Sequence, residues 1–232
     1  MKIALCLSGI PRQFEKGYEY HKRNLLDHHD VDVFIHTWTD LIPDVTRDVR
    51  QLYKPKEMTH SVQFPKDSFD KYAHLSPEGW PAKNVFHMLY SMFRANMLKK
   101  EYELRYNMEY DYVVRSRFDF ALNIVPNFYE ACPGKVYVPN DYIKGRIQPN
   151  GLICNDQFAY GDSKVMDLYS NTFWMINFAV AHGAPVIGED LLSINLQAHR
   201  LVGENMCYID MNHPFPPGKY NNTPHSLLRD DL

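Results

Sequence analysis

The sequence predicts an α/β protein in which helices flank one mixed, mostly parallel sheet within a single domain. The first forty residues alternate an apolar run, a helix-like segment and a second apolar run, which is the unit that builds parallel sheets with right-handed crossovers. Residues 110–119 form another apolar run that turns charged at its carboxyl end, where open α/β sheets bind ligands. With 232 residues, 45% hydrophobic and 23% charged, the chain can bury a core without disulfides.

The first strand has the clearest pattern. Residues 2–8 are apolar and stop at Ser8 and Gly9, which is typical of a buried parallel strand that ends in a ligand-facing loop. Residues 40–83 are polar and interrupted by proline, so an excursion over the sheet is expected there. Further strands are expected at residues 32–38, 56–59, 110–119, 135–139, 157–160 and 207–210. Helices are expected at residues 14–28, between 84 and 107, at 163–169, from there to 182, and at 189–201.

The longest predicted helix begins after Asn84, a candidate N-cap, and Asn107 can end it. Apolar residues recur along it at spacings of three and four, which is typical of a helix that packs on a sheet. These are Phe86, Leu89, Tyr90, Phe93, Met97 and Leu104. Ser163 is the candidate cap of the next helix, and Gly203 is expected to end the last one.

Charge and hydropathy exclude several classes of protein. The 25 Lys and Arg residues against 28 Asp and Glu leave no global positive field, so a nucleic-acid partner is disfavoured. No apolar run approaches the ~20 residues of a membrane helix, and the apolar start is too short for a signal peptide. We therefore expect no integral membrane segment and a cytoplasmic location, which for a viral protein is the host cytoplasm.

Residues 1–212 are expected to form the domain, and residues 213–232 an irregular, proline-rich tail. The four cysteines have no CxxC spacing and are predicted to be reduced residues in or near the core. They are Cys6, Cys132, Cys154 and Cys207.

The loop after the first strand is the first candidate site. The backbone N–H groups around Ser8 and Gly9 could approach a phosphate, and Arg12 could add a bidentate contact. The alternative is an ordinary strand-to-helix turn with a surface arginine. Neither the GxGxxG nor the GxxxxGK[ST] spacing is present, so a dinucleotide site and a P-loop are not supported.

A second candidate follows the strand at residues 110–119. Arg115, Arg117 and Asp119 occupy alternate positions of an extended segment, so their side chains are expected on one face. Such a cluster suits a diphosphate, with the arginines on its oxygens and the carboxylate on a bridging Mg²⁺ or Mn²⁺. The alternative is a buried ion pair in which the aspartate merely neutralises the arginines.

Two further pairs carry carboxylates or amides. Asp156 and Gln157 precede a short aromatic strand, where they could bind sugar hydroxyls, although Asn155 before them could equally form an Asx turn. Glu189 and Asp190 begin a helix, where the helix dipole favours them whether or not one serves as a base for an acceptor hydroxyl.

Aromatic and histidine side chains complete the predicted site. Trp38 and His36 end the second strand and are expected to line the same sheet edge, with Trp38 contacting substrate and His36 serving mainly as a core histidine. No HExxH motif or Cys/His zinc spacing occurs. His213, after the last predicted strand, is a weak candidate metal ligand.

The order of these motifs resembles that of a family of small viral and bacterial glycosyltransferases with the GT-A fold. The resemblance runs from residue 1 to about residue 210 and rests on LCLSGIPR, DVFIHTW, MLYSMFRAN, YDYVVRSRFDF, NDQFAYGDS and GED. It implies a GT-A-type, Rossmann-like sheet in which about residues 1–120 bind the nucleotide and about residues 121–212 face the acceptor. It also implies a nucleoside-diphosphate sugar as donor and a glycan or other hydroxyl as acceptor.

Two motifs carry the chemistry that the resemblance implies. The GT-A fold places a D-x-D motif, which binds a divalent metal and the donor diphosphate, where this chain has Arg117-Phe-Asp119. The resemblance thus implies Asp119 as a ligand of Mn²⁺ or Mg²⁺, while Arg117 can bind phosphate but no metal. Gly188-Glu189-Asp190 stands where inverting members carry an xED motif, which implies Asp190 as the base with Glu189 beside it.

Two other functions remain open from the sequence. A nucleotidyltransferase acting on sugar phosphates needs the same metal–diphosphate site, but its glycine-rich, lysine-containing loop is not visible here. A catalytically inactive nucleotide- or glycan-binding module would keep the fold with an unproductive site. Asp119 paired with an arginine in a closed sheet edge without a pocket would favour this inactive module.

Overall fold

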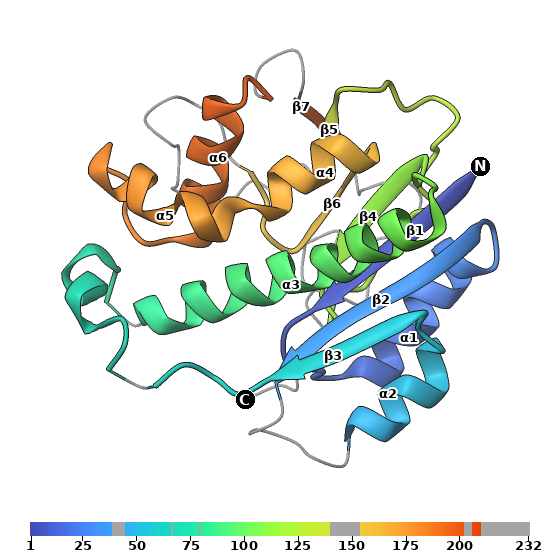
Figure 1. Ribbon diagram of the computed structural model, residues 1–232, viewed down its shortest axis with the longest axis horizontal. Helices are drawn as coiled ribbons and strands as arrows, with labels where there is room; N and C mark the ends of the chain where they lie inside the picture. The colour runs from blue at the N-terminus through green and yellow to red at the C-terminus, as the bar shows by residue number, and fades with distance from the viewer. Residues whose placement is uncertain (39–44, 66, 79, 140–153, 202–205, 210–232) are drawn as a thin grey trace, which may run out of the picture.

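A seven-stranded sheet with helices on both faces forms the frame of the protein (Figure 1). The computed structural model describes residues 1–38, 45–65, 67–78, 80–139, 154–201 and 206–209. In the sheet the strands lie in the order β3-β2-β1-β4-β6-β5-β7. The strands are β1 (Lys2–Ser8), β2 (Asp30–Trp38), β3 (Glu57–Ser61), β4 (Tyr112–Ser116), β5 (Val136–Pro139), β6 (Phe158–Gly161) and β7 (Met206–Ile209).

The sheet is mixed and mostly parallel, as the sequence predicts. β1 pairs in parallel with β2 and β4, β2 with β3, and β5 with β7, whereas β6 runs antiparallel to both β4 and β5. Each predicted strand is present, although β6 begins one residue later than expected and β4 is shorter than its apolar run. The prediction of an α/β fold around one sheet is therefore confirmed.

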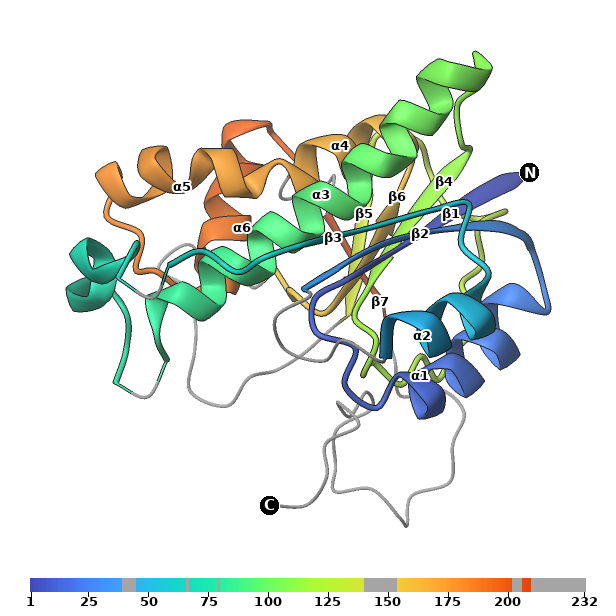
Figure 2. The same ribbon diagram turned by 60° about the horizontal axis from the view of Figure 1, so that its bottom comes forward.

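Helices cover the two faces of the sheet unequally (Figure 2). α1 and α2 lie on one face of the sheet. α3 and α4 cross the other face, and α5 and α6 pack on the same side. The α-helices are α1 (Phe14–His21), α2 (Val45–Tyr53), α3 (Ala82–Tyr106), α4 (Ser163–Ser170), α5 (Thr172–Ala181) and α6 (Gly188–Ala198). α1 continues as a π-helical turn over Lys22–Leu26, and a 3-10 helix spans Asp70–Leu75.

Alternating side chains of the strands build two hydrophobic layers. Ile3, Leu5 and Leu7 of β1 pack with residues of α1 and α2, while Ala4 and Cys6 pack with residues of α3 and α4. Both layers are fully buried along β1, which is why the run at residues 2–8 is continuously apolar rather than alternating. No helix of the described residues is long and apolar enough to cross a membrane.

The ends of three predicted helices differ from the sequence analysis. Pro81, not Asn84, is the N-cap of α3, because proline fits the start of a helix and Asn84 already lies in the first turn. Asp162, not Ser163, caps α4, since its carboxylate accepts a hydrogen bond from the Val165 N–H. α6 ends at Ala198, three residues early, and Gly203 lies outside the described residues. Asn107 ends α3 in the left-handed conformation, as predicted.

The buried face of α3 is only partly the one that its apolar residues predict. Phe86 and Leu89 are buried, but Leu104 is 76% exposed. Met92 and Leu98, which are not among the apolar residues named from the sequence, are buried as well. The reason is that the buried stripe continues through two charged residues of α3, which an apolar pattern cannot reveal. These two residues are Lys99 and Glu103.

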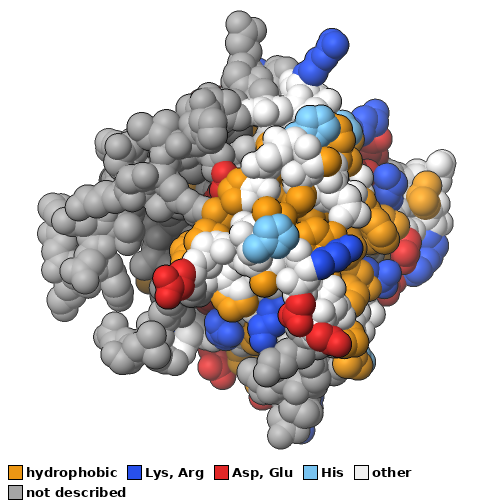
Figure 3. All heavy atoms as spheres, turned by 90° about the vertical axis from the view of Figure 1, so that its left-hand side faces the viewer, with side chains coloured by type: hydrophobic (Ala, Val, Ile, Leu, Met, Phe, Trp, Pro, Cys, Tyr) orange, Lys and Arg blue, Asp and Glu red, His pale blue; other side chains and the backbone are white. Residues whose placement is uncertain are grey.

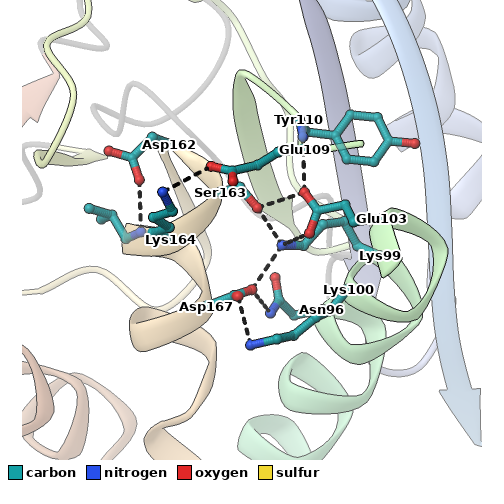
Figure 4. Close-up of polar contacts among 11 residues, drawn as sticks. Asn96, Lys99, Lys100, Glu103, Glu109, Tyr110, Asp162, Ser163, Lys164 and Asp167 are labelled. Atoms are coloured by element: carbon teal, nitrogen blue, oxygen red, sulfur yellow. Dashed lines mark hydrogen bonds and ion pairs between the residues drawn. The ribbon is translucent and has the colours of Figure 1, made fainter. Parts of the chain in front are cut away.

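Lys99 and Glu103 belong to a buried polar network between α3 and α4 (Figure 4). Lys99 Nζ donates to Glu103 Oε2 at 3.0 Å, to Ser163 Oγ at 2.6 Å and to Asp167 Oδ1 at 2.8 Å. Burial opposes the charge of Lys99, but Asp167 and Glu103 raise its pKa above the ordinary value. The lysine therefore stays charged and joins the two helices with every donor in use.

The cysteines divide by burial. Cys6 and Cys154 are buried free thiols, and burial raises the pKa of Cys6 to about 12. Cys132 is exposed, so its placement in or near the core is wrong; it follows a turn, not an apolar strand. The side chain of Cys207, His213 and the predicted tail at residues 213–232 lie outside the described residues.

Candidate functional site

A pocket of about 480 Å³ opens at the carboxyl ends of the parallel strands. β1 lies between β2 and β4 in the sheet. From β1 the chain first adds β2 and β3 on one side and then returns to add β4 on the other, so the strand order reverses at β1. Ligands of open α/β sheets bind in the crevice at such a switch point. Figure 3 looks at the side toward which β1, β2 and β3 run, and basic, acidic and hydrophobic side chains lie next to one another there.

The pocket brings together most of the residues that the sequence nominates. Those that line it are Ser8, Gly9, Arg12, Trp38, Arg115, Arg117, Asp156 and Glu189. Three other candidates, Asp119, Gln157 and Asp190, are not part of the lining. Five segments far apart in sequence thus meet at one pocket, as expected. Glu189 lines this pocket, whereas its neighbour Asp190 does not.

Arg115 is the central charge of the pocket. It is 1% exposed, and the described residues offer no hydrogen-bond partner to any of its three guanidinium nitrogens. In β4 it lies opposite Cys6 of β1 and Ala159 of β6, on the sheet face covered by α3. Burial lowers its pKa, although Tyr169 and Asp156 act in the opposite direction. Burying a charge without partners destabilises a folded protein by several kcal/mol. An anion bound next to Arg115 would offset this penalty.

Arg117 is held differently from Arg115. Its Nε and Nη2 atoms each donate at 2.9 Å to one carboxylate oxygen of Asp119, in a bidentate ion pair. Burial opposes the charge of Arg117, but Asp119 raises its pKa above the ordinary value. The ion-pair alternative from the sequence analysis therefore holds for Arg117 and Asp119, while Arg115 stays outside the pair.

The loop after β1 is fixed by its own hydrogen bonds. The Gly9 N–H donates to the His36 carbonyl at 3.2 Å and to Ser91 Oγ at 2.8 Å. This corrects the expectation that the Gly9 N–H is available to a phosphate, because local groups already accept it. Ser8 Oγ, by contrast, is buried in the lining with no hydrogen-bond partner among the described residues, and Arg12 is exposed at the rim.

His36 holds this loop from the second strand. Its Nδ1 lies 2.8 Å from Ser91 Oγ and its Nε2 lies 3.0 Å from Ser61 Oγ, so one ring joins β2, β3 and α3. Burial, with smaller effects of Arg94 and His60, lowers the pKa of His36 to about 3. The ring is therefore neutral at physiological pH and has a structural role, as predicted.

Acidification is expected to destabilise the protein through His36 and through His21, whose pKa burial also lowers to about 3. An unfolded histidine takes up its proton near pH 6.5, so below that pH the unfolded state binds more protons than the folded state. Stability is then lost progressively from about pH 6.5 toward pH 3. Urea midpoints between about pH 7 and about pH 5 measure this loss. A His36→Gln variant should fall less steeply; an equal fall in both proteins would contradict the assignment.

Aromatic side chains form another part of the pocket lining. Trp38 and His87 line the pocket with ring centroids 5.1 Å apart, and Phe64 and Tyr90 pack behind them. Trp80 is 51% exposed at the rim. Of these residues, only Trp38 was predicted from the sequence to contact substrate, and His87 and Trp80 were not. Trp80 lies just before α3 and His87 lies in its second turn, so neither follows a strand end. The contact with Trp38 identifies His87, and the pocket lining identifies Trp80.

The start of α6 supplies the acidic side of the pocket. A Cβ at Gly188 would lie 2.6 Å from Asp156 Oδ2, so glycine is what allows the Asp156 carboxylate to rest on this helix. Asn155 Oδ1 accepts from the N–H groups of Gln157 and Phe158, so the Asx-turn alternative holds for Asn155. Asp156 and Glu189 then face the pocket together.

The described residues do not form the metal site that the resemblance implies. Both oxygens of Asp119 are occupied by Arg117, and no group of three His, Cys, Asp or Glu side chains in the described part of the chain could hold a metal. The second expected ligand, His213, lies outside that part.

No known family model matches the chain, and no curated protein sequence matches it.

Proposed function

We propose that this chain is a GT-A-type glycosyltransferase that moves a sugar from a nucleoside-diphosphate donor to a glycan or other hydroxyl acceptor. The observation that carries the proposal is Arg115, a buried cation without a hydrogen-bond partner among the described residues, at the lining of a switch-point pocket. A diphosphate ester supplies the anion that such a group lacks, and charge-assisted, bidentate contacts suit guanidinium and phosphate.

Two groups of lining residues, one aromatic and one acidic, match the two ends of such a donor. The planar rings of Trp38 and His87 offer a surface on which a nucleobase can stack. The carboxylates of Asp156 and Glu189 can accept hydrogen bonds from sugar hydroxyls. Arg115 supplies the positive charge that the diphosphate between base and sugar requires.

The same arrangement supports direct displacement at the anomeric carbon. The acceptor oxygen bonds to this carbon while the bond from the carbon to the diphosphate oxygen breaks, and the acceptor proton passes to a carboxylate. Glu189 is the better candidate base, because it lines the pocket and Asp190 does not. Arg115 and Arg12 would stabilise the charge that gathers on the departing nucleoside diphosphate.

Replacing Arg115 by methionine is expected to weaken donor binding without loss of stability. UDP-glucose or GDP-mannose should raise the Tm of the wild type, because a ligand of the native state stabilises it. The variant should lose at least about tenfold in affinity, as a hydrogen bond to a charged group contributes roughly 1.5–3 kcal/mol. Its own Tm should equal or exceed that of the wild type, since the substitution removes a buried charge that has no hydrogen-bond partner among the described residues.

Arg23→Met is the matched control, because Arg23 is exposed in the π-helical turn that follows α1, the helix on the sheet face opposite α3. It should leave both Tm and donor binding unchanged. A large fall in the Tm of Arg115→Met would instead indicate a structural arginine. If no UDP or GDP sugar stabilises the wild type, the donor site itself is refuted.

A catalytically inactive binding module is the second candidate. The bidentate pair of Arg117 and Asp119 favours it, because the pair withholds the one carboxylate expected to act with a metal. The open pocket argues against it, since an unproductive sheet edge was expected to be closed. Donor binding without any release of nucleoside diphosphate, with or without added sugar acceptors, would support this module over a transferase.

A further inference from the structure

We infer that the pocket binds its diphosphate through arginines alone, and that the ion pair of Arg117 and Asp119 occupies the place of a metal ion. The inference rests on the proposed donor site and specifies how that site neutralises its ligand. Asp119 is then a positioning residue for Arg117 and not a metal ligand.

The geometry of Asp119 is the first reason. Its carboxylate accepts two hydrogen bonds of 2.9 Å from one guanidinium, and its side chain is only 5% exposed. A divalent cation bound to these oxygens would lie beside the positive charge of Arg117. Like charges a few ångströms apart in a partly buried site repel strongly. Metal binding would thus require breaking the ion pair or overcoming this repulsion.

The charge of the pocket is the second reason. Arg115 and Arg117 lie two residues apart at the end of β4, and both line the pocket. Burial lowers the pKa of Arg115, and Arg117 acts in the same direction. A metal ion added at Asp119 would further disfavour the buried charge of Arg115. The remaining carboxylates of the lining, Asp156 and Glu189, lie at the α6 side and form no metal-holding group in the described part of the chain.

The number of available cations is the third reason. The two phosphates of a nucleotide sugar carry one negative charge each. Within the described residues, neither Arg115 nor Arg12 has an ion pair, and both line the pocket. These two arginines therefore supply one positive charge for each of the two phosphates. The charge of Arg117 is balanced by that of Asp119, but Arg117 can still donate its remaining N–H groups to a phosphate oxygen.

Titration calorimetry with UDP and with GDP, in EDTA and in excess Mn²⁺, tests the inference. Mn²⁺ neutralises part of the charge of a free diphosphate, so a site made of arginines should bind the metal-free ligand at least as tightly as the Mn²⁺ complex. We expect the Kd in EDTA to be equal to or lower than that in Mn²⁺. Binding that needs Mn²⁺, or that Mn²⁺ tightens by about tenfold or more, overturns the inference and leaves the donor site intact.

Two variants separate the roles of the side chains. Asp119→Asn keeps one acceptor for Arg117, and its Kd should change by the same factor in EDTA and in Mn²⁺. If Asp119 bound a metal, this variant would lose only the binding that depends on Mn²⁺, which would contradict the inference. Arg12→Gln should weaken binding in both buffers. If neither nucleotide binds the wild type in either buffer, the donor site and this inference both fall.

Discussion

Replacing Lys99 by methionine is expected to lower the free energy of unfolding by about 3–5 kcal/mol, as breaking a buried ion pair from one side usually does. Lys99 is fully buried and donates three hydrogen bonds, two of them to carboxylates. Methionine fills the space but leaves the buried Glu103 and the partly buried Asp167 without this cation (Figure 4). Urea unfolding followed by circular dichroism measures the loss.

Lys100→Met is the matched control for this experiment. Lys100 also contacts Asp167, at 3.0 Å, but it is 46% exposed, and exposed ion pairs contribute roughly 0–1 kcal/mol. A second substitution of Glu103 by leucine in the Lys99→Met background should recover part of the loss, because it removes a stranded charge. Equal effects of Lys99→Met and Lys100→Met would show that the network contributes little.

This network also shows which part of the fold the sequence could not predict. The strands are short, continuous apolar runs, and such runs identify a buried sheet by themselves. In α3, however, charged residues occupy the buried stripe, and only the position of Asp167 on α4 explains why. α2 was missed for a related reason: in its nine residues only Val49 and Tyr53 are buried, too few to establish a period.

The site shows the same division. Arg115, Arg117 and Asp156 could be nominated because charged residues at the ends of apolar strands gather at one edge of the sheet. The sequence treats both arginines alike, yet Arg117 is paired with Asp119 and Arg115 has no such pair. That difference arises from the path of the chain after β4. A Cβ at Gly17 of α1 would overlap the Phe118 carbonyl, so close helix packing fixes this segment.

The hydrogen bonds around Gly9 were equally inaccessible to sequence reasoning. They join the loop after β1 to His36 on β2 and to Ser91 in the middle of α3. Residues separated by 82 positions meet there, and no local pattern marks Ser91 as their partner. A glycine that reads as a phosphate-binding turn thus serves to anchor the loop, while the neighbouring Ser8 hydroxyl stays at the pocket.

Replacing Glu189 by glutamine is expected to reduce sugar transfer by about 10²–10⁴-fold, the usual contribution of a general base. Glutamine keeps the shape of the side chain and its place at the start of α6 but cannot take the acceptor proton. Donor affinity should fall far less than the rate, because the glutamine amide oxygen can still accept a hydrogen bond from a sugar hydroxyl and the charges assigned to the diphosphate are those of the arginines. Release of UDP or GDP from the sugar nucleotide that stabilises the wild type measures the rate, with simple glycosides or water as acceptor.

Asp190→Asn distinguishes this assignment from the one that the xED resemblance implies. Asp190 is buried beside Glu189 but is not part of the pocket lining, so the variant should keep transfer within about tenfold of the wild type. Its Tm must be measured as well, because a buried carboxylate contributes to folding whether or not it takes part in catalysis. Loss of transfer in Asp190→Asn with normal Tm and donor binding, together with an active Glu189→Gln, would identify Asp190 as the base. The glycosyltransferase proposal would survive that result, and only the identity of the group that receives the proton would change.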